Sequence, residues 1–577
     1  MACAPQPANR PEADPALPNI IVYLVDTLRA DHLGCYGYAR PTSPTIDGLA
    51  ADAVIFDNAY TQASWTKPAV ATLFTGLYPS RHGAVRREHA LRGDVPTMAE
   101  VLRGVGYSTV AVISNPNILP VYGFDRGFDE FVDVESVQRT ARAADVHRAV
   151  LETLDEHPRR PLFLYIHTRD PHDPYEPPPP YDTIFADAPV PGSAGAGSDT
   201  TVRRRALYDG EIAYGDAELA VLIEHLRSVG LWDSSVVVFL SDHGEELGGR
   251  GGWGHGTSLF EEQIHVPLIV RIPDGVRGGR VEHPVRLVDI LPTLCELLGV
   301  DAPEGLDGQS FAGLLDGKPA DGYDPTMYAE LNNDRHVVSS LTTGRFKLIE
   351  RQSPTVQAGR RLFDLSDDPA EVHDLSADEP ATAGLLRQEM TRVEARLNHG
   401  IYLEICNGTS RDERHRVRGS IEVIGGRFER VIPTDLEDGD RLDVTEDGVR
   451  LELDVRLRSR DNPIGQRPFV IRDVDRFRLL PSPESQTLEI DLSIDGEPAG
   501  PKQLLIGQGF THDGPLPLVV PVQDQHLQLS TSGHALRTPV LAPWPYCWLF
   551  SIAQVSVPQV EADDELEDRL RALGYVE

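Results

Sequence analysis

Short apolar runs alternate with helical patterns over residues 19–300 of the chain. The apolar runs are rich in β-branched residues and have the length of strands that are buried on both faces of a sheet. These runs cover residues 19–25, 108–113, 161–166, 235–240 and 266–271. Amphipathic helical patterns lie between and after them, at residues 45–53, 95–105, 146–156, 208–226 and 288–298. The alternation predicts an α/β domain in which helices sandwich a mostly parallel sheet.

The pattern changes after residue 300. Residues 305–398 have the pattern of a C-terminal subdomain of the same unit, with short strands at 345–349 and 361–365 and a helix at 385–397. From about residue 400, segments such as 449–457 and 487–494 alternate apolar and polar residues between Asp-Gly turns, which is typical of antiparallel β structure. We therefore predict four parts: a flexible lead or tether at 1–17, the α/β domain at 18–398, an antiparallel all-β domain at 400–557 and a C-terminal helix within 558–577.

Side chains that bind metals follow two of the predicted strands. Asp26 follows the first run, and Asp242 and His243 follow the fourth. Ligand sites of open α/β sheets lie at the carboxyl ends of the strands, and carboxylate oxygens with an imidazole nitrogen suit a divalent cation. From its own segment alone, Asp26 is equally well interpreted as a cap of the next turn.

Thr66 lies where a loop opens a helix, in the segment Trp65-Thr66-Lys67-Pro68. Proline in the first turn of a helix loses no needed hydrogen bond, so the helix is expected to begin here. Free amides and the dipole at a helix N-terminus attract anions, and the Thr66 hydroxyl is therefore a candidate nucleophile. The common alternative is a threonine that only caps the helix.

Three histidines lie in loops near the same strand ends. His167 and His172 follow the third run, and His255 lies in the glycine-rich segment 251–256. Glycines let the backbone approach a ligand, although a lone histidine among glycines is usually an ordinary loop residue. We expect the walls of a substrate pocket chiefly within residues 174–206.

Composition narrows the function classes. The 577 residues carry a formal charge of −35, so the surface repels polyanions and a nucleic-acid partner is excluded. An anionic substrate then needs a local positive centre such as a metal ion. The five cysteines include no C-x-x-C pair, and neither a zinc finger nor a disulfide framework is indicated.

No apolar run reaches the length of a transmembrane segment. The Pro- and Ala-rich start around Cys3 resembles the tether of a lipoprotein just after its lipidated cysteine. If the true start lies upstream of Cys3, we expect a periplasmic or cell-surface lipoprotein; otherwise cytoplasmic residence is the expectation. The sequence carries no signal for an oligomeric state.

Several ordered motifs between residues 18 and 397 resemble the sulfatase family of the alkaline phosphatase superfamily. They are Asp26 with Arg29-Ala-Asp-His-Leu-Gly-Cys-Tyr-Gly37, Leu73-Phe-Thr-Gly-Leu-Tyr-Pro79, Asp170-Pro-His-Asp-Pro174, Ser241-Asp-His-Gly-Glu245, His255 with Leu259-Phe-Glu-Glu262, Leu287-Val-Asp-Ile-Leu-Pro-Thr293 and Gly344-Arg-Phe-Lys-Leu348. The resemblance implies an alkaline-phosphatase-like fold and ester hydrolysis with one divalent metal ion, calcium, manganese, magnesium or zinc.

Carried over by position, the resemblance makes Asp26, Asp242 and His243 metal ligands and Thr66 both a ligand and the nucleophile. His172 and His255 fall where the family binds the ester oxyanions or protonates the leaving group, and His167 is a further candidate for substrate binding.

The motifs also depart from the family. Sulfatases carry Cys or Ser at the first position of Cys-x-Pro-x-Arg and oxidise it to formylglycine, whereas the segment here reads Thr66-Lys-Pro-Ala-Val70. Formylglycine is therefore not expected. Thr27 replaces an acid that follows Asp26 in the family, and Asn115 and Asn117 stand where a lysine and a histidine are usual. Lys67 either offsets substrate charge or is a solvated lysine.

These departures favour phosphoester over sulfate-ester chemistry. A sulfated threonine cannot eliminate to an aldehyde, whereas water can attack a phosphorylated threonine in line. The leading hypothesis is a metal-dependent hydrolase of phosphate or sulfate esters of a small molecule, glycan or lipid. The alternatives are a transferase that passes the phospho group to a sugar or lipid alcohol, and a catalytically dead protein that binds a glycan or envelope component.

Overall fold

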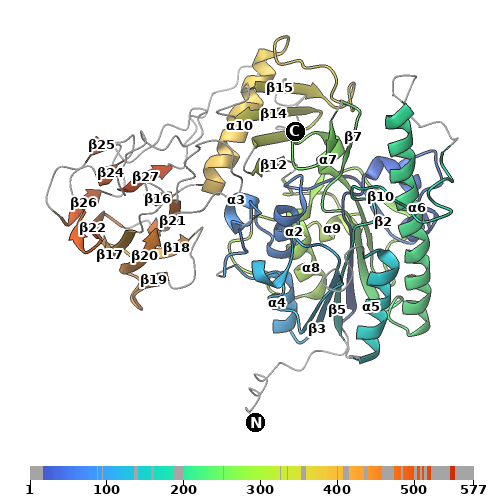
Figure 1. The fold of residues 1–577 in the computed structure, drawn as a ribbon, viewed down its shortest axis with the longest axis horizontal. Coiled ribbons are helices and arrows are strands. Elements are labelled where there is room, and N and C mark those ends of the chain that lie inside the picture. The colour runs from blue at the N-terminus through green and yellow to red at the C-terminus, as the bar shows by residue number, and fades with distance from the viewer. Residues whose placement is uncertain are drawn as a thin grey trace. The chain divides into compact units, whose positions relative to one another are not determined.

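The computed structural model of the chain divides into two compact units, one up to Arg387 and one over Gln388–Glu561 (Figure 1). The structure describes residues 17–87, 89–93, 95–134, 141–156, 161–186, 199–250, 252–324, 326–333, 336–352, 359–398, 400–406, 415–433, 440–457, 474–481, 485–499, 503–506, 510–511, 516–521 and 546–552. Residues 1–16 of the lead predicted at 1–17, and the predicted helix within 558–577, lie outside the described residues. None of the described helices has the length and apolar character of a membrane span.

A nine-stranded sheet forms the centre of the first unit. Its order is β10-β2-β9-β6-β1-β5-β3-β4, with β11 paired to β2. The strands are β1 (Asn19–Val25), β2 (Val54–Tyr60), β3 (Ser108–Ile113), β4 (Glu130–Asp133), β5 (Leu162–Thr168), β6 (Ser235–Leu240), β9 (His265–Arg271), β10 (Gly279–Val281) and β11 (Val285–Arg286). Every pairing is parallel except those of β9, which runs antiparallel to β2 and to β6. The predicted mostly parallel sheet is confirmed, and β9 is its one reversed strand.

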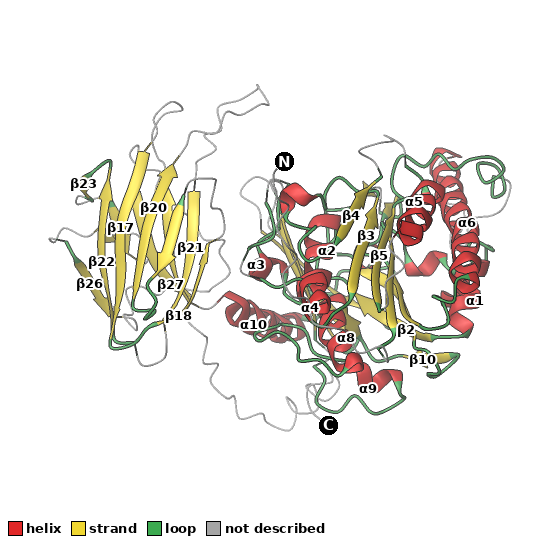
Figure 2. Cartoon of the chain, turned by 90° about the horizontal axis from the view of Figure 1, so that it is seen from below, coloured by secondary structure: helices red, strands yellow, loops and turns green. Residues whose placement is uncertain are grey.

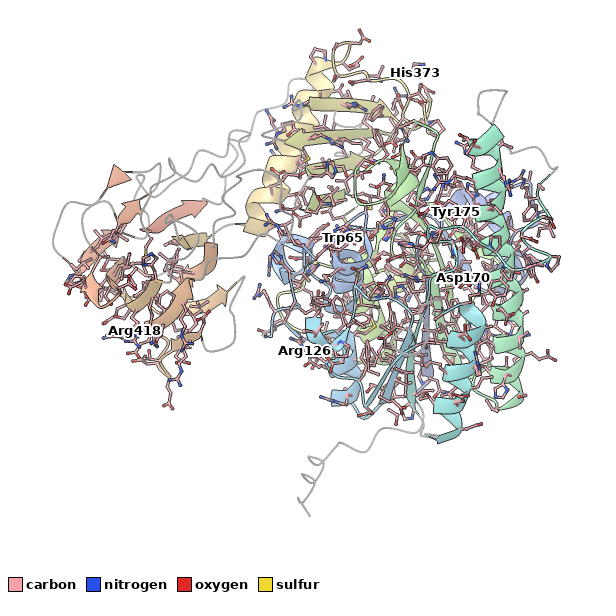
Figure 3. All side chains as sticks on the ribbon, viewed as in Figure 1. Trp65, Arg126, Asp170, Tyr175, His373 and Arg418 are labelled. Atoms are coloured by element: carbon pink, nitrogen blue, oxygen red, sulfur yellow. The ribbon has the colours of Figure 1, made fainter. Side chains whose placement is uncertain are left out.

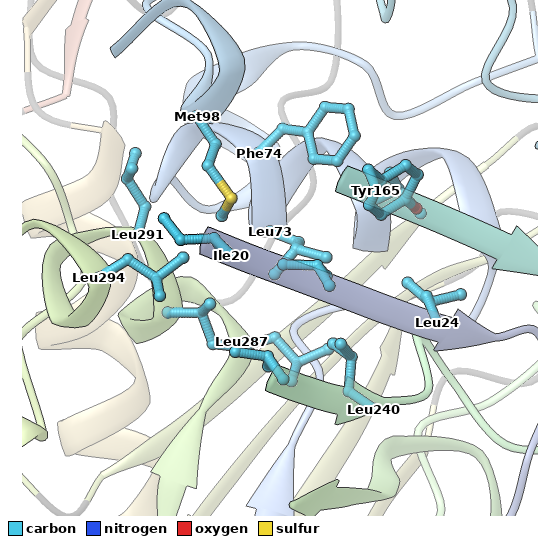
Figure 4. Close-up of a cluster of buried hydrophobic side chains, with 14 of the residues drawn as sticks. Ile20, Leu24, Leu73, Phe74, Met98, Tyr165, Leu240, Leu287, Leu291 and Leu294 are labelled. Carbon is cyan, nitrogen blue, oxygen red and sulfur yellow. The ribbon is translucent and has the colours of Figure 1, made fainter. Parts of the chain in front are cut away.

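Helices cover both faces of this sheet (Figure 2). Alternate residues of β1 point to opposite sides, so Ile20, Val22 and Leu24 belong to one buried cluster and Ile21 and Tyr23 to another. The first cluster is completed by α2 (Thr66–Thr75), α4 (Met98–Gly104), α8 (Ile290–Leu298) and α9 (Ala312–Leu315), and the second by α1 (Pro44–Ala51), α5 (Ala143–Glu156) and α6 (Asp199–Ser228). Figure 4 shows residues of the first cluster on β1, α2 and α8.

The remaining short elements of this unit lie in its loops. They are α3 (Pro79–His82), α7 (Glu261–Ile264), the hairpin of β7 (Glu246–Leu247) and β8 (Trp253–Gly254), and four 3-10 turns at Ala30–His32, Gly34–Tyr36, Pro120–Tyr122 and Leu287–Asp289.

Several predicted element boundaries differ from the structure, and those of α6 and β5 bear on the site. Helix α6 begins at Asp199 rather than at residue 208, because the first turns are polar and carry no apolar face that the pattern could show. Strand β5 extends to Thr168, which places His167 within the strand rather than after it. Strand β2 was not predicted, since its Asp57 and Asn58 interrupt the apolar run.

A four-stranded antiparallel sheet follows in the order β12 (Met327–Asn332), β13 (Val337–Thr343), β14 (Phe346–Gln352) and β15 (Gly359–Asp364), and α10 (Pro380–Asn398) comes after it. This sheet holds a loop that contains His255. The side chain of Asn333 donates to the carbonyl oxygen of Gly256 at 2.9 Å, and that of Arg351 donates to the carbonyl oxygen of Thr257 at 2.7 Å. The backbone N–H of Gly256 in turn donates to the carbonyl oxygen of Ser64 at 2.7 Å, close to Thr66 in the chain.

The second unit consists of two β-sheets around one apolar cluster. One sheet has the order β18 (Phe428–Pro433), β21 (Val474–Pro481), β16 (Gly400–Cys406), β27 (Tyr546–Ile552), β24 (Leu504–Ile506) and β25 (Phe510–Thr511). The other contains β19 (Arg441–Val444), β20 (Arg450–Leu457), β17 (His415–Ile424), β22 (Thr487–Ile494), β23 (Glu497–Pro498) and β26 (Leu518–Pro521). Residues of both sheets share the cluster, as in a sandwich. All pairings are antiparallel except that of β24 with β27, so the predicted antiparallel character is confirmed with this one exception.

The Phe74 side chain anchors α2 to the central sheet. Its ring packs edge-on against Tyr165 of β5 at a centroid distance of 4.8 Å, and only 1% of the residue is exposed. We predict that Phe74→Ala lowers the free energy of unfolding of this unit by about 3–5 kcal/mol, because the lost ring leaves a cavity. Denaturant unfolding followed for the first unit measures this. The control Val121→Ala, at a residue that is 76% exposed, is expected to change it by less than about 0.5 kcal/mol. A loss below about 1 kcal/mol for Phe74→Ala would contradict the anchoring role.

Candidate active site

The carboxyl ends of four neighbouring strands meet at one edge of the central sheet. The strands are β6, β1, β5 and β3, and all of their mutual pairings are parallel. Leu24 of β1 stands opposite Leu240 of β6, so Asp26 and Asp242, each two residues further on, reach the same level. Leu24 also stands opposite His167 of β5, which in turn stands opposite Ile113 of β3.

Side-chain alternation directs these residues to the face that α2 covers. Leu24, Ile113, Tyr165 and Leu240 all belong to the buried cluster on that face. The residues two positions later keep the same direction because the side-chain period of a strand is two. They are Asp26, Asn115, His167 and Asp242. Where the strands end, the apolar face of the sheet therefore gives way to these four polar side chains, which form the polar group of the site.

Thr66 reaches this group from the N-terminus of α2. Its Oγ1 lies 3.4 Å from Asp26 Oδ2 and 3.3 Å from His243 Nε2, and the residue is 1% exposed. The N-cap of α2 is Trp65, labelled in Figure 3, and Thr66 is the first helical residue. The capping interpretation of Thr66 is therefore wrong. Its hydroxyl points to the strand ends, in the positive field of the helix terminus.

Three of these residues could hold a cation. One ligand atom from each of Asp26, Asp242 and His243 lies within 4.8 Å of the others. Asp26 Oδ1 and Asp242 Oδ2 are buried without a hydrogen-bond partner in the described residues. Buried carboxylate oxygens without a partner are costly unless a cation or proton accompanies them, so the site fits a metal ion. Thr66 Oγ1 can complete the set as a fourth ligand.

The tautomer of His243 suits this role. Its Nδ1 lies 2.9 Å from the carbonyl oxygen of Gly244, which can only accept, so Nδ1 carries the proton. The lone pair of Nε2 then faces the carboxylates, 3.4 Å from Asp26 Oδ1 and 3.4 Å from Asp242 Oδ2. Burial, with the nearby His255, lowers the pKa of His243 to about 3, so the imidazole stays neutral as a metal ligand must.

The pKa values of Asp242 and Asp26 are shifted in opposite directions. Burial and the negative charge of Asp26 raise the pKa of Asp242 well above its ordinary value. Burial also opposes ionisation of Asp26, but its contact with His167 and the imidazoles around it outweigh burial and lower its pKa. One carboxylate is thus held ionised, and the second ionises most readily with a cation between them.

Asn115 and His167 also contact Asp26, at the same oxygen as Thr66. The Asn115 amide donates to Asp26 Oδ2, and His167 Nε2 lies 3.5 Å from the same oxygen. His167 Nδ1 is 2.9 Å from the Tyr165 hydroxyl. Both predicted residues are therefore in the polar group, where they orient the Asp26 carboxylate.

His255 and His172 lie beside the metal-ligand group. The ring centres of His255 and His243 are 4.5 Å apart, and those of His255 and His172 are 5.0 Å apart. His255 Nδ1 is 3.1 Å from Glu245 Oε1, which leaves Nε2 for a substrate. Burial lowers the pKa of His255, but the hydrogen bond and charge of Glu245 outweigh it and the net shift is upward, which favours the protonated form.

The structure does not bring Lys67 and the Asn117 side chain into this group. Lys67 is fully buried, its ammonium donates to the carbonyl oxygens of Arg87 and His89, and it lies 3.2 Å from the centre of the Tyr122 ring. The solvated interpretation of Lys67 is therefore wrong. Asn117 donates its backbone N–H to Asn115 Oδ1 at 2.8 Å and so orients the Asn115 amide.

Sequence reasoning missed two residues that shape the site. Glu245 orients His255, and Ser241 Oγ links the loops by accepting from Leu28 N at 3.0 Å and donating to the His243 carbonyl at 2.7 Å. Glu245 and Ser241 both lie in the Ser241-Asp-His-Gly-Glu245 motif. The motif therefore marks both residues, but it does not show which groups they contact.

Family models match most of the first unit. The model described as Sulfatase matches residues 18–300, and that described as N-sulphoglucosamine sulphohydrolase, C-terminal, matches residues 249–398.

Individual proteins that resemble the chain include two sulfatases and a solved structure with the same fold. An ulvan-active sulfatase of Formosa agariphila is 26% identical over 398 residues, which cover 63% of this chain and 76% of the relative. An N-acetylglucosamine-6-O-sulfatase of Bacteroides thetaiotaomicron is 23% identical, covering 64% of this chain and 84% of the relative. The crystal structure of a phosphonate monoester hydrolase of Agrobacterium radiobacter shares the fold, with a TM-score of 0.59 and 23% identity over 66% of this chain and 96% of that one. The two sulfatase models together match residues 18–398, and the chain belongs to the sulfatase family, a family of ester hydrolases.

Proposed function

We propose that the protein is a metal-dependent phosphoester hydrolase in which Thr66 is the nucleophile. The observation that carries this proposal is the position of Thr66 Oγ1, 3.4 Å from Asp26 Oδ2 and 3.3 Å from His243 Nε2 at the start of α2. A hydroxyl between a buried carboxylate, a neutral imidazole and a helix N-terminus is placed for deprotonation and attack.

Residues around Thr66 support phosphoester chemistry over sulfate-ester chemistry. Threonine is not the Cys or Ser from which the family makes formylglycine, so the enzyme works without that group. Val70, at the position of the supporting arginine, is fully buried in the apolar cluster between α2 and the sheet. A phosphorylated threonine remains open to in-line attack by water, whereas a sulfated threonine lacks the elimination that releases sulfate from formylglycine.

The metal ligands in this proposal are Asp26, Thr66, Asp242 and His243. Calcium, manganese, magnesium and zinc all accept such a mixed set of oxygen and imidazole ligands. A bound divalent ion would supply the positive charge that lowers the pKa of the Thr66 hydroxyl and offsets charge on the phosphoryl oxygens.

The chain's own residues then perform two displacements at phosphorus. Thr66 attacks as the alkoxide, after its hydroxyl proton has gone to solvent, and is released as the alkoxide at the end of the cycle. Its Oγ1 forms a bond to phosphorus while the bond from phosphorus to the leaving alcohol breaks, and protonated His255 gives its proton to the departing oxygen. In the second displacement neutral His255 takes a proton from water, whose oxygen attacks phosphorus. The bond to Thr66 Oγ1 breaks, and phosphate or its monoester leaves. His172 Nδ1 lies 2.6 Å from the carbonyl of Asp173, so Nδ1 carries a proton, and in the imidazolium form Nε2 donates a second hydrogen bond to a phosphoryl oxygen.

Sulfate-ester hydrolysis is the second candidate, because the matched relatives carry sulfatase names. Aryl substrates separate the two. A phosphodiester such as bis(4-nitrophenyl) phosphate is expected to turn over faster than 4-nitrophenyl sulfate. Transfer to an alcohol would instead appear as a rate that rises when glycerol or a glycan is added.

Replacing Thr66 tests the nucleophile. We predict that Thr66→Ala lowers kcat for the aryl phosphodiester by about 10³-fold or more, because it removes the attacking oxygen. Thr66→Ser keeps a hydroxyl and should retain measurable activity. Thr75→Ala is the matched control, since Thr75 lies at the other end of α2 and donates only to the Ala71 carbonyl. Wild-type turnover by Thr66→Ala would rule out this mechanism.

Removal of the metal tests the cation site. We predict that dialysis against a chelator abolishes turnover and lowers the melting temperature, because binding to the folded state alone stabilises it by about 2.7 kcal/mol at 100 times the dissociation constant. Activity assays and thermal melts after adding back each of the four ions identify the ion that is used. Asp242→Asn should bind less metal by elemental analysis and should not recover. Full activity of metal-free protein would contradict the proposal.

A further inference from the structure

The guanidinium of Arg204, on α6, is held in a fixed position beside the two histidines. Its Nη2 lies 2.6 Å from Asp173 Oδ1. Its Cζ lies 3.9 Å from the centre of the Trp253 ring and 5.5 Å from that of Tyr175. A guanidinium stacked on aromatic rings keeps its N–H edge directed outward, and the stacking limits its motion.

The contacts with Asp173 and Trp253 link Arg204 to the side of the site where the leaving group is proposed to depart. Asp173 directly follows His172, and Trp253 lies two residues before His255. The rings of His172 and His255 are 5.0 Å apart. Figure 3 labels Tyr175, which comes from the loop after β5 that also carries His172. Arg204 therefore contacts both of the segments that carry the two histidines.

Arg204 retains capacity to bind an anion. Its side chain is 35% exposed, and within the described residues Asp173 is its one hydrogen-bond acceptor. A guanidinium has five N–H donors, so donors remain for an anion beyond the one that Asp173 uses. The contrast is Arg29, whose guanidinium is 13% exposed and donates to Asp31, Glu262 and the Glu245 carbonyl. Arg29 is a structural link, whereas Arg204 is a partly open cation.

Because the chain is strongly acidic, a partly open cation such as Arg204 determines where an anion can bind. With a formal charge of −35, the protein repels anions except where a local positive group compensates. Lys67 does not serve, because its ammonium is buried against backbone carbonyls. Arg204 presents a fork that matches the two oxygens of a carboxylate or the oxygens of a sulfate or phosphate group.

We propose that Arg204 binds an anionic group on the leaving alcohol, so that the preferred substrates are esters of alcohols that carry a second negative charge. This inference rests on the proposed function, in which His255 faces the departing oxygen. Such an alcohol carries a planar or tetrahedral oxyanion a few bonds from its ester oxygen. A carboxylate and a sulfate or phosphate group are its two sources.

Aryl esters with matched leaving-group pKa test the proposal. Methyl aryl phosphodiesters of 4-nitrophenol, its 3-carboxy derivative and its 3-sulfo derivative are compared by kcat/KM, with the holoenzyme at constant ionic strength. We expect the wild type to prefer at least one anionic leaving group about 10-fold, the scale of one charge-assisted hydrogen-bonded pair. The carboxy and sulfo arms show which oxyanion is preferred.

Variants assign the preference to Arg204. Arg204→Gln is expected to bring the ratio of kcat/KM for anionic over neutral esters to about one, through a loss that falls selectively on the anionic esters. Arg204→Lys should keep part of the preference, because it retains the charge without the fork. Arg203→Gln is the matched control, since it removes the same charge from the neighbouring exposed residue and should leave the ratio unchanged.

The outcomes separate this inference from the proposed function. Equal kcat/KM for neutral and anionic esters in the wild type overturns the role of Arg204 while leaving Thr66 chemistry intact. An equal loss on all esters in Arg204→Gln also overturns it, since it would show a structural role. No turnover of any ester with each of the four metals would contradict the proposed function and the inference together.

Discussion

Two buried carboxylates at the ends of neighbouring strands set the physical problem that the rest of the site answers. Asp26 and Asp242 are fully buried, stand at the same level of the sheet, and each leaves an oxygen without a hydrogen-bond partner among the described residues. Burial and mutual repulsion together disfavour two ionised carboxylates. A cation between them removes both costs, and His243 is held as the neutral tautomer that can join it.

The surrounding structure fixes these groups before any ligand binds. Thr27 lies in the left-handed region with φ of 59°, unusual for a β-branched residue, directly after Asp26. The Thr27 hydroxyl donates to the Asp26 carbonyl, and the Thr27 carbonyl accepts from the Tyr208 hydroxyl at 2.7 Å. The turn after β1 is therefore held by side chains on both sides. This conformation costs folding free energy, which the surrounding contacts offset.

The sequence predicts the centre of this site well because strand periodicity is local information. The runs that end before Asp26, Asn115 and Asp242 mark β1, β3 and β6, and parallel pairing brings their ends together. The partners that complete the site come from far along the chain. Glu245 and Arg204 act through contacts whose geometry no local pattern encodes, and the reversed direction of β9 depends on which strands it pairs with. The buried position of Lys67 is not predictable from the sequence, because a lysine between Thr66 and Pro68 gives no sign of the carbonyl oxygens that accept from its ammonium.

The central claim is that the Thr66 oxygen itself carries the transferred group. Rapid-quench intact-protein mass spectrometry during turnover of an aryl phosphodiester tests it most directly, with peptide mapping to locate the added mass. The account predicts one phosphoryl adduct on the peptide that contains Thr66, absent when Thr66 is replaced by alanine. An adduct on another residue, or an oxidised residue 66 in the resting protein, would contradict it.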